Sequence, residues 1–124
     1  MLNLKSLILV GALSASTAAL AAPARMSDSQ FLELNRCRAL VASTDLGGGD
    51  TKSIDALLKV QGRGRDVYTS DRGDELQWNA TRAAHHANAD ARARLIAERD
   101  GNCQSLIGTV TAAGGSADKP SSIH

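Results

Sequence analysis

Aromatic residues are scarce in this chain of 124 residues, which has one phenylalanine, one tyrosine and one tryptophan. Large aliphatic residues are also few after the first twenty positions, and alanine fills many of the remaining apolar places. Small domains bury a low fraction of their surface, so a core with this little apolar area is marginally stable by itself. We therefore expect a covalent cross-link to support the fold.

An excess of charge of either sign is also missing. The chain has 14 Lys and Arg against 13 Asp and Glu, a formal net charge of +1. A nearly neutral protein has no field that would gather nucleic acid or anionic lipid, so neither is expected as a partner. The apolar run at the start is too short and too diluted by small polar residues to span a bilayer comfortably, which takes about 20 apolar residues.

Catalytic motifs are absent as well. No serine stands in a Gly-x-Ser-x-Gly elbow, and the carboxylates are spread singly, mostly beside arginines. The triple glycine at 47–49 has neither the preceding strand nor the Gly-Lys-Ser/Thr ending of a phosphate-binding loop, so it is interpreted as a turn. We expect no enzymatic activity and no cofactor, and can name no catalytic residue.

The first residues have the layout of a secretory signal peptide. Lys5 supplies a positive charge near the start, and residues 6–20 are apolar or small and carry no charge. Ala19-Leu20-Ala21 then offers the small-x-small pattern after which a signal peptidase cuts, and cleavage after Ala24 also fits. We expect residues 1–21 to be removed and the protein to be periplasmic or secreted. An uncleaved N-terminal anchor is the alternative.

Helical patterns fill residues 27–111, which we expect to form one all-α domain, a small bundle of three or four helices with one disulfide. Ser27 and Gln30 have the spacing of a capping box. The first helix then presents an apolar stripe and ends before the glycines; the stripe consists of Phe31, Leu34, Cys37, Leu40 and Val41.

The remaining elements are less sharply marked. A second helix follows a cap at Asp50, Thr51 or Ser53, and Ile54, Leu57 and Leu58 form its inner face. We expect Val67 and Tyr68 to pack onto the core, and a third helix to open at Ser70 or Asp71 with the inner stripe Leu76, Ala80, Ala83 and Ala87. A bend or short break at 88–90 precedes the last helix, in which Gly101 is a weak point. Residues 112–124 are expected to form a disordered tail.

The two cysteines lie on the apolar stripes of the first and last helices. If Cys37 and Cys103 face one core, these helices are neighbours and a disulfide is geometrically plausible. In an oxidising compartment such a bridge persists, and the long loop that it closes would stabilise the fold by up to ~4 kcal/mol. A redox-active pair commonly has the spacing Cys-x-x-Cys, which is absent here.

The stretch from Gly62 to Trp78 is a candidate for binding a protein partner. It combines arginines with both remaining aromatics, the residue types that dominate interface hot spots, and two glycines loosen its start. The candidate residues are Arg63, Arg65, Tyr68, Arg72 and Trp78. The competing interpretation, favoured by the shortage of aromatics, is that Tyr68 and Trp78 are core anchors.

A second candidate is a metal site at His86 and Asp90. Four residues apart on one continuous helix, an imidazole and a carboxylate could hold zinc or copper with at least one further ligand. Solvent-exposed histidines on a helix surface are the simpler interpretation. The sequence thus favours an exported, non-catalytic interaction module such as an inhibitor or a chaperone-like factor, bound to an envelope protein. The alternatives are a metal-binding envelope protein, an enzyme or a purely structural protein.

Overall fold

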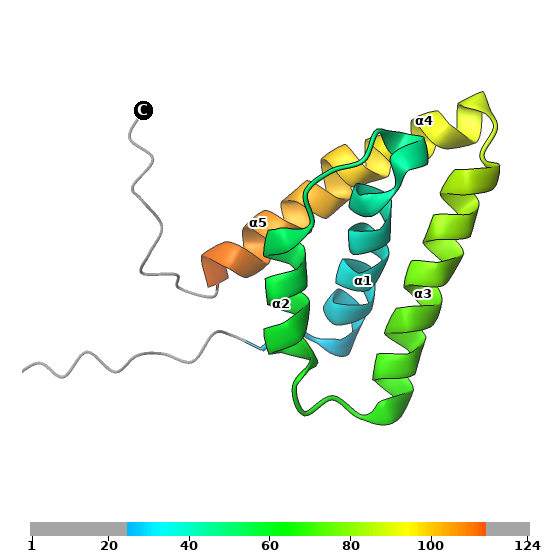
Figure 1. The fold of residues 1–124 in the computed structure, drawn as a ribbon. Coiled ribbons are helices and arrows are strands. Elements are labelled where there is room, and N and C mark those ends of the chain that lie inside the picture. The colour runs from blue at the N-terminus through cyan, green and yellow to red at the C-terminus, as the bar shows by residue number, and fades with distance from the viewer. Residues whose placement is uncertain (1–24, 114–124) are drawn as a thin grey trace, which may run out of the picture.

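Helix α1 (Asp28–Ala42) lies at the centre of the fold and the other helices are arranged around it (Figure 1). The computed structural model describes residues 25–113, so the predicted signal peptide lies outside the described residues. The predicted tail overlaps the last two residues of α5 and otherwise also lies outside them. The other helices are α2 (Lys52–Gly62), α3 (Val67–His86), α4 (Ala89–Glu98) and α5 (Gln104–Ala113). Residues 25–113 contain no strand, which confirms the predicted all-α class.

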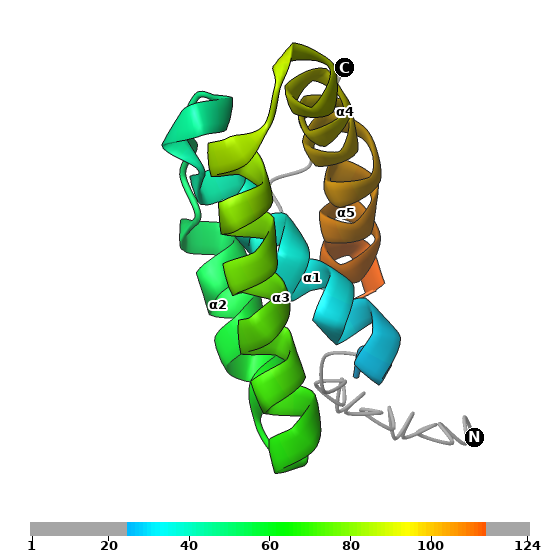
Figure 2. The ribbon, with the colours of Figure 1, turned by 90° about the vertical axis from the view of Figure 1, so that its right-hand side faces the viewer.

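Two short helical turns complete the fold. A 3₁₀ turn at Thr44–Leu46 follows α1, and a π-helical turn at Arg99–Cys103 joins α4 to α5 without a break. The π turn contains Gly101, which the sequence marked as a weak point. Within the described residues the helices thus form four rods, and α1 lies between α2 and α3 on one side and the long α4–α5 rod on the other (Figure 2). No helix among them is both long and apolar enough to cross a membrane.

The N-terminus of α1 is capped as its sequence predicts. The Ser27 hydroxyl accepts a hydrogen bond from the Gln30 amide, and the Gln30 side chain accepts one from the Ser27 amide. Helix α2 returns antiparallel to α1, since the amide of Met26 donates to the Gln61 side chain at its far end. Helix α3 then runs parallel to α1 (Figure 1).

The core is small and consists largely of short side chains. Leu34, Leu40 and the two cysteines are the largest side chains that are fully buried. Helix α4 has no buried residue, and α3 contributes mainly Ala80 and Ala84. The main cluster contains Met26, Leu34, Cys37, Ala39, Leu40, Val41, Leu46, Ile54, Ala80, Ala84, Cys103, Leu106 and Val110.

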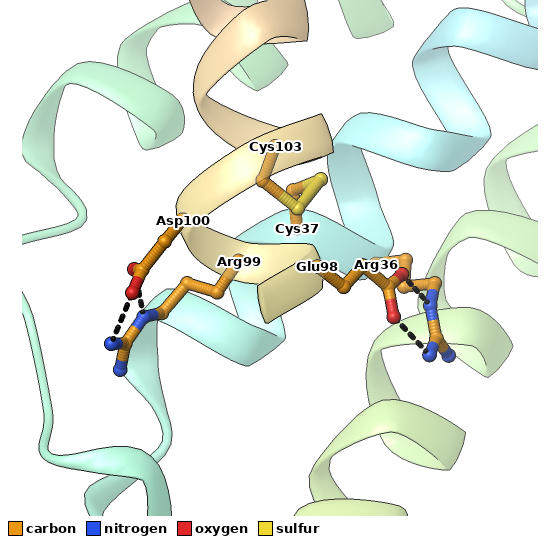
Figure 3. Close-up of a disulfide and its surroundings, with 6 residues drawn as sticks. All are labelled: Arg36, Cys37, Glu98, Arg99, Asp100 and Cys103. Atoms are coloured by element: carbon orange, nitrogen blue, oxygen red, sulfur yellow. Dashed lines mark hydrogen bonds and ion pairs between the residues drawn. A yellow bond between two sulfur atoms is a disulfide. The ribbon is translucent and has the colours of Figure 1, made fainter. Parts of the chain in front are cut away.

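A disulfide joins Cys37 of α1 to Cys103 at the end of the π turn, with the two Cα atoms 5.4 Å apart. The predicted cross-link is therefore present, and both cysteines are buried. Figure 3 shows two ion pairs beside it, Arg36 with Glu98 and Arg99 with Asp100. The first is bidentate, and the hydrogen bonds from Arg36 hold the pKa of Glu98 below its ordinary value.

Candidate interaction face on α3

The Arg65 side chain turns into the protein and does not face a partner. It donates hydrogen bonds to the carbonyls of Gln61 and Met26 and to the carboxylate of Asp28. Its guanidinium lies over the Phe31 ring, 4.7 Å from the ring centre, and only 2% of the side chain is exposed. Arg65 therefore closes the end of the bundle where α1 begins and α2 ends, so the surface role predicted for it does not fit its position.

Helix α3 begins earlier than the sequence suggested. Asp66 has an extended backbone, and its carboxylate accepts a hydrogen bond from the Thr69 amide, so Asp66 is the N-cap. This start turns Thr69 toward the core and leaves Val67 and Tyr68 in the first turn facing solvent, 75% and 79% exposed. The expectation that Val67 and Tyr68 pack onto the core is therefore wrong.

Trp78 is also exposed, at 62%. The inner face of α3 approaches α1 too closely for an indole. Gly73 lies against the side chain of Asn35, and Gln77 donates a hydrogen bond to that same side chain. The core-anchor interpretation of Tyr68 and Trp78 is thus wrong. The inner stripe is made of Thr69, Gly73, Ala80 and Ala84, whereas Ala83 is exposed.

The side of α3 that points away from α1 forms what we call the outer face. All its residues are exposed, and in Figure 1 none of the described helices covers it. The outer face consists of Val67, Asp71, Asp74, Trp78, Arg82 and His85, which recur every three or four residues and so lie in one stripe along the helix. Tyr68, Arg72 and Glu75 lie along its edge.

The edge and the stripe differ in how their charges are paired. At the edge, Arg72 forms an ion pair with Glu75, which raises the pKa of Arg72. On the stripe, Asp71, Asp74 and Arg82 make no ion pair or side-chain hydrogen bond with any other residue in 25–113. These three residues were not among the predicted contact residues, although their helical spacing about Trp78 is visible in the sequence.

Arg63, the remaining predicted contact residue, is exposed in the loop before α3. Its carbonyl accepts a hydrogen bond from Arg25, which fixes the loop backbone against the segment that leads into α1. Arg63 is thus at the surface, whereas the side chain of Arg65 is buried.

The helical spacing on which the metal site depended is lost. Helix α3 ends at His86, Ala87 is its C-cap, and Asn88 caps α4 by accepting a hydrogen bond from Ala91. The predicted break is thus present, and His86 and Asp90 lie on different helices. His85 instead approaches Asp45, with 3.5 Å between Nδ1 and Oδ2. Among residues 25–113 there is no group of three His, Cys, Asp or Glu residues that could hold a metal ion.

A shallow hollow of about 360 Å³ lies between the glycine turn and the π turn. Its only charged groups are Arg99 and Asp100, which pair with each other, and Arg99 also donates to the carbonyl of Leu46. This pairing holds the pKa of Asp100 below its ordinary value. The two charged groups thus pair with each other, and the other lining residues are apolar, glycine or amide: Val41, Leu46, Gly47, Gly48, Gly49 and Gln104.

No protein-family model matches the chain, and no curated protein or solved structure matches it either.

Proposed function

We propose that this chain is a small exported protein, periplasmic or secreted, that acts without catalysis by binding another protein through the outer face of α3. An inhibitor or a chaperone-like factor would act in this way. The observation that carries the proposal is the exposure of Tyr68 and Trp78, two of only three aromatic residues, in a protein with very little apolar area to bury.

Leaving these side chains in water has a clear cost in stability. Burial of one large apolar side chain contributes about 2 kcal/mol, a sizeable share of what a small domain has. Trp, Tyr and Arg are also the residues on which binding energy concentrates at protein interfaces. A binding role for Trp78 and Tyr68 explains why both are exposed on α3 and not buried against α1.

Export rests on two further points. Residues 1–21 have the composition of a signal peptide, and a disulfide between Cys37 and Cys103 persists in oxidising compartments. Binding of a metal by His86 and Asp90 is an alternative, but it no longer has the helical spacing that suggested it.

Site-specific photo-cross-linking tests the proposal in the intact envelope. A cross-linking residue in place of Trp78 should capture a protein. The same residue in place of Val60, an exposed apolar residue on α2, should capture none or much less. Equal capture at both positions, or capture at neither, would contradict a binding role for the outer face.

A further inference from the structure

The charges of the outer face are arranged symmetrically about Trp78. Asp74 lies four residues before Trp78 and Arg82 four residues after it; Asp71 lies seven before and His85 seven after. These offsets keep all of them on one stripe of the helix. Acidic groups therefore occupy the half toward the N-terminus of α3, and basic groups the half toward its C-terminus.

We infer that the outer face of α3 binds the same face of a second copy of this chain, with the two helices antiparallel and the two Trp78 side chains at the centre. A two-fold axis through Trp78 places each residue opposite the one at the same offset on the other side. Asp74 of one copy then meets Arg82 of the other, and Asp71 meets His85, which also lies 3.5 Å from Asp45 of its own chain. Each of these pairs occurs twice, as in any isologous interface.

Several observations favour a second copy as the occupant. Asp71, Asp74 and Arg82 have no ion-pair partner within residues 25–113, so their charges are available to another molecule. No described helix covers the face (Figure 2). The arrangement is self-complementary only when the helices are antiparallel, because parallel helices would place like charges opposite each other.

The size of the face limits the strength of the dimer. Helix α3 has 20 residues and is about 30 Å long, so one stripe of it covers less than the ~800 Å² per partner of a standard interface. Stacking of the central tryptophans adds attraction, and the charge pairs set the orientation. We therefore expect a weak dimer that forms reversibly as the concentration rises.

This inference rests on the proposed function, since it identifies the partner of the same face. Sedimentation of the purified protein over roughly 1 µM to 1 mM should show a monomer–dimer equilibrium. The fluorescence emission maximum of Trp78, the only tryptophan, should shift to shorter wavelength over the same range of concentration, because the indole leaves water in the dimer. A monomer throughout this range would overturn the inference.

Charge reversal tests the antiparallel register. Asp74→Arg and Arg82→Asp should each weaken self-association by more than about tenfold, because each turns two attractive pairs into two repulsive ones. An equimolar mixture of the two variants should dimerise again, since both pairs between positions 74 and 82 across that mixed dimer join opposite charges. Failure of the mixture to dimerise, or dimers of either single variant as tight as the wild type, would overturn the register.

Matched controls keep the test specific. Glu33→Arg and Lys59→Glu make the same changes in net charge at exposed positions on α1 and α2, outside the outer face, and should leave the dimer unchanged. All four positions are exposed, and circular dichroism checks that each variant stays folded. If the protein is monomeric but residue 78 still cross-links a different protein, the inference of a dimer is wrong and the proposal that the outer face binds a protein partner is supported. If residue 78 cross-links nothing, the proposed function itself fails.

Discussion

The side-chain amide of Asn35 occupies the space that a side chain on Gly73 would need. A Cβ atom at Gly73 would lie 2.8 Å from Nδ2 and 3.0 Å from Cγ of Asn35. The amide is buried and held from both sides, since it donates to the carbonyl of Phe31 and accepts from the Gln77 side chain. Helices α1 and α3 can approach this closely only because residue 73 is glycine.

Gly73→Ala should therefore destabilise the protein by about 1–3 kcal/mol, as overpacking of a rigid site does. The sign of this change in stability is informative, because alanine is otherwise more favourable than glycine in a helix interior by up to about 1 kcal/mol. Gly108→Ala is the matched control: its Cβ would meet nothing within 4 Å, so it should stabilise the protein. Urea unfolding measures the change in the free energy of unfolding for both variants. Destabilisation by both substitutions would contradict the explanation that Gly73 is required by its close contact with Asn35.

The disulfide should provide much of the stability of so small a core. Cys37 and Cys103 are 66 residues apart, and the chain-entropy model gives ~4 kcal/mol as an upper figure for a loop of this length. The double variant Cys37→Ala/Cys103→Ala should lose several kcal/mol in a urea titration, which for a small domain is a large part of the total. Intact mass should rise by two hydrogens on reduction of the unfolded protein. Free thiols in the unreduced protein would refute the bridge.

The Arg36–Glu98 pair predicts a pH dependence of stability. Arg36 lowers the pKa of Glu98 below its ordinary value of 4.5, so the ionised carboxylate favours the folded state. This contribution is fully present above the unfolded pKa and is lost as the pH falls through the lower, folded pKa. Glu98→Gln should cost about 1 kcal/mol at pH 7, and its difference from the wild type should shrink under acid.

A double-mutant cycle shows whether that cost belongs to the pair. In an Arg36→Ala background, Glu98→Gln should change the free energy of unfolding little, since no guanidinium remains to prefer the charged form. An undiminished cost at pH 7 in that background would assign the effect to some other contact of Glu98.

Arg65 should tolerate no substitution, lysine included. Its planar guanidinium serves two carbonyls and one carboxylate while it lies over Phe31, and a single ammonium cannot reproduce that set. Arg65→Lys should lower the melting temperature by several degrees, whereas Arg63→Lys, in the exposed loop two residues before, should leave it unchanged. Equal melting temperatures for the two variants would show that Arg65 is not the closing contact.

Local signals in the sequence were sufficient for several of the helix boundaries. The capping box at Ser27, the apolar stripe of the first helix and the break near Asn88 depend on neighbouring residues alone, and each was predicted correctly. The disulfide followed from placing Cys37 and Cys103 on two apolar stripes that had to share one small core.

The orientation of α3 could not be derived in the same way. The start at Asp66 instead of Ser70 or Asp71 places Val67 and Tyr68 in the first turn of the helix. Which side of the helix faces α1 is set by tertiary packing, above all by the contact of Gly73 with Asn35. The role of Arg65 depends on tertiary contacts with Met26 and Asp28, more than 35 residues away, which no local pattern records. Scarcity of aromatics suggested burial of Tyr68 and Trp78, but the side of α3 that packs on Asn35 carries Gly73 and Gln77 and leaves both aromatics exposed.

Phe31 and Trp78 should therefore respond very differently to truncation. Phe31 is 6% exposed and Trp78 is 62% exposed. Phe31→Ala should cost ~3–5 kcal/mol and unfold much of the protein at ambient temperature, as loss of a buried aromatic does. Trp78→Ser should stay within about 0.5 kcal/mol of the wild type, because an exposed side chain loses little on truncation. Thermal melts followed by circular dichroism at low protein concentration, where any dimer is dissociated, measure both variants. A large loss for Trp78→Ser under those conditions would mean that the indole is anchored in the bundle, and the outer face would then have no aromatic centre with which to bind a partner.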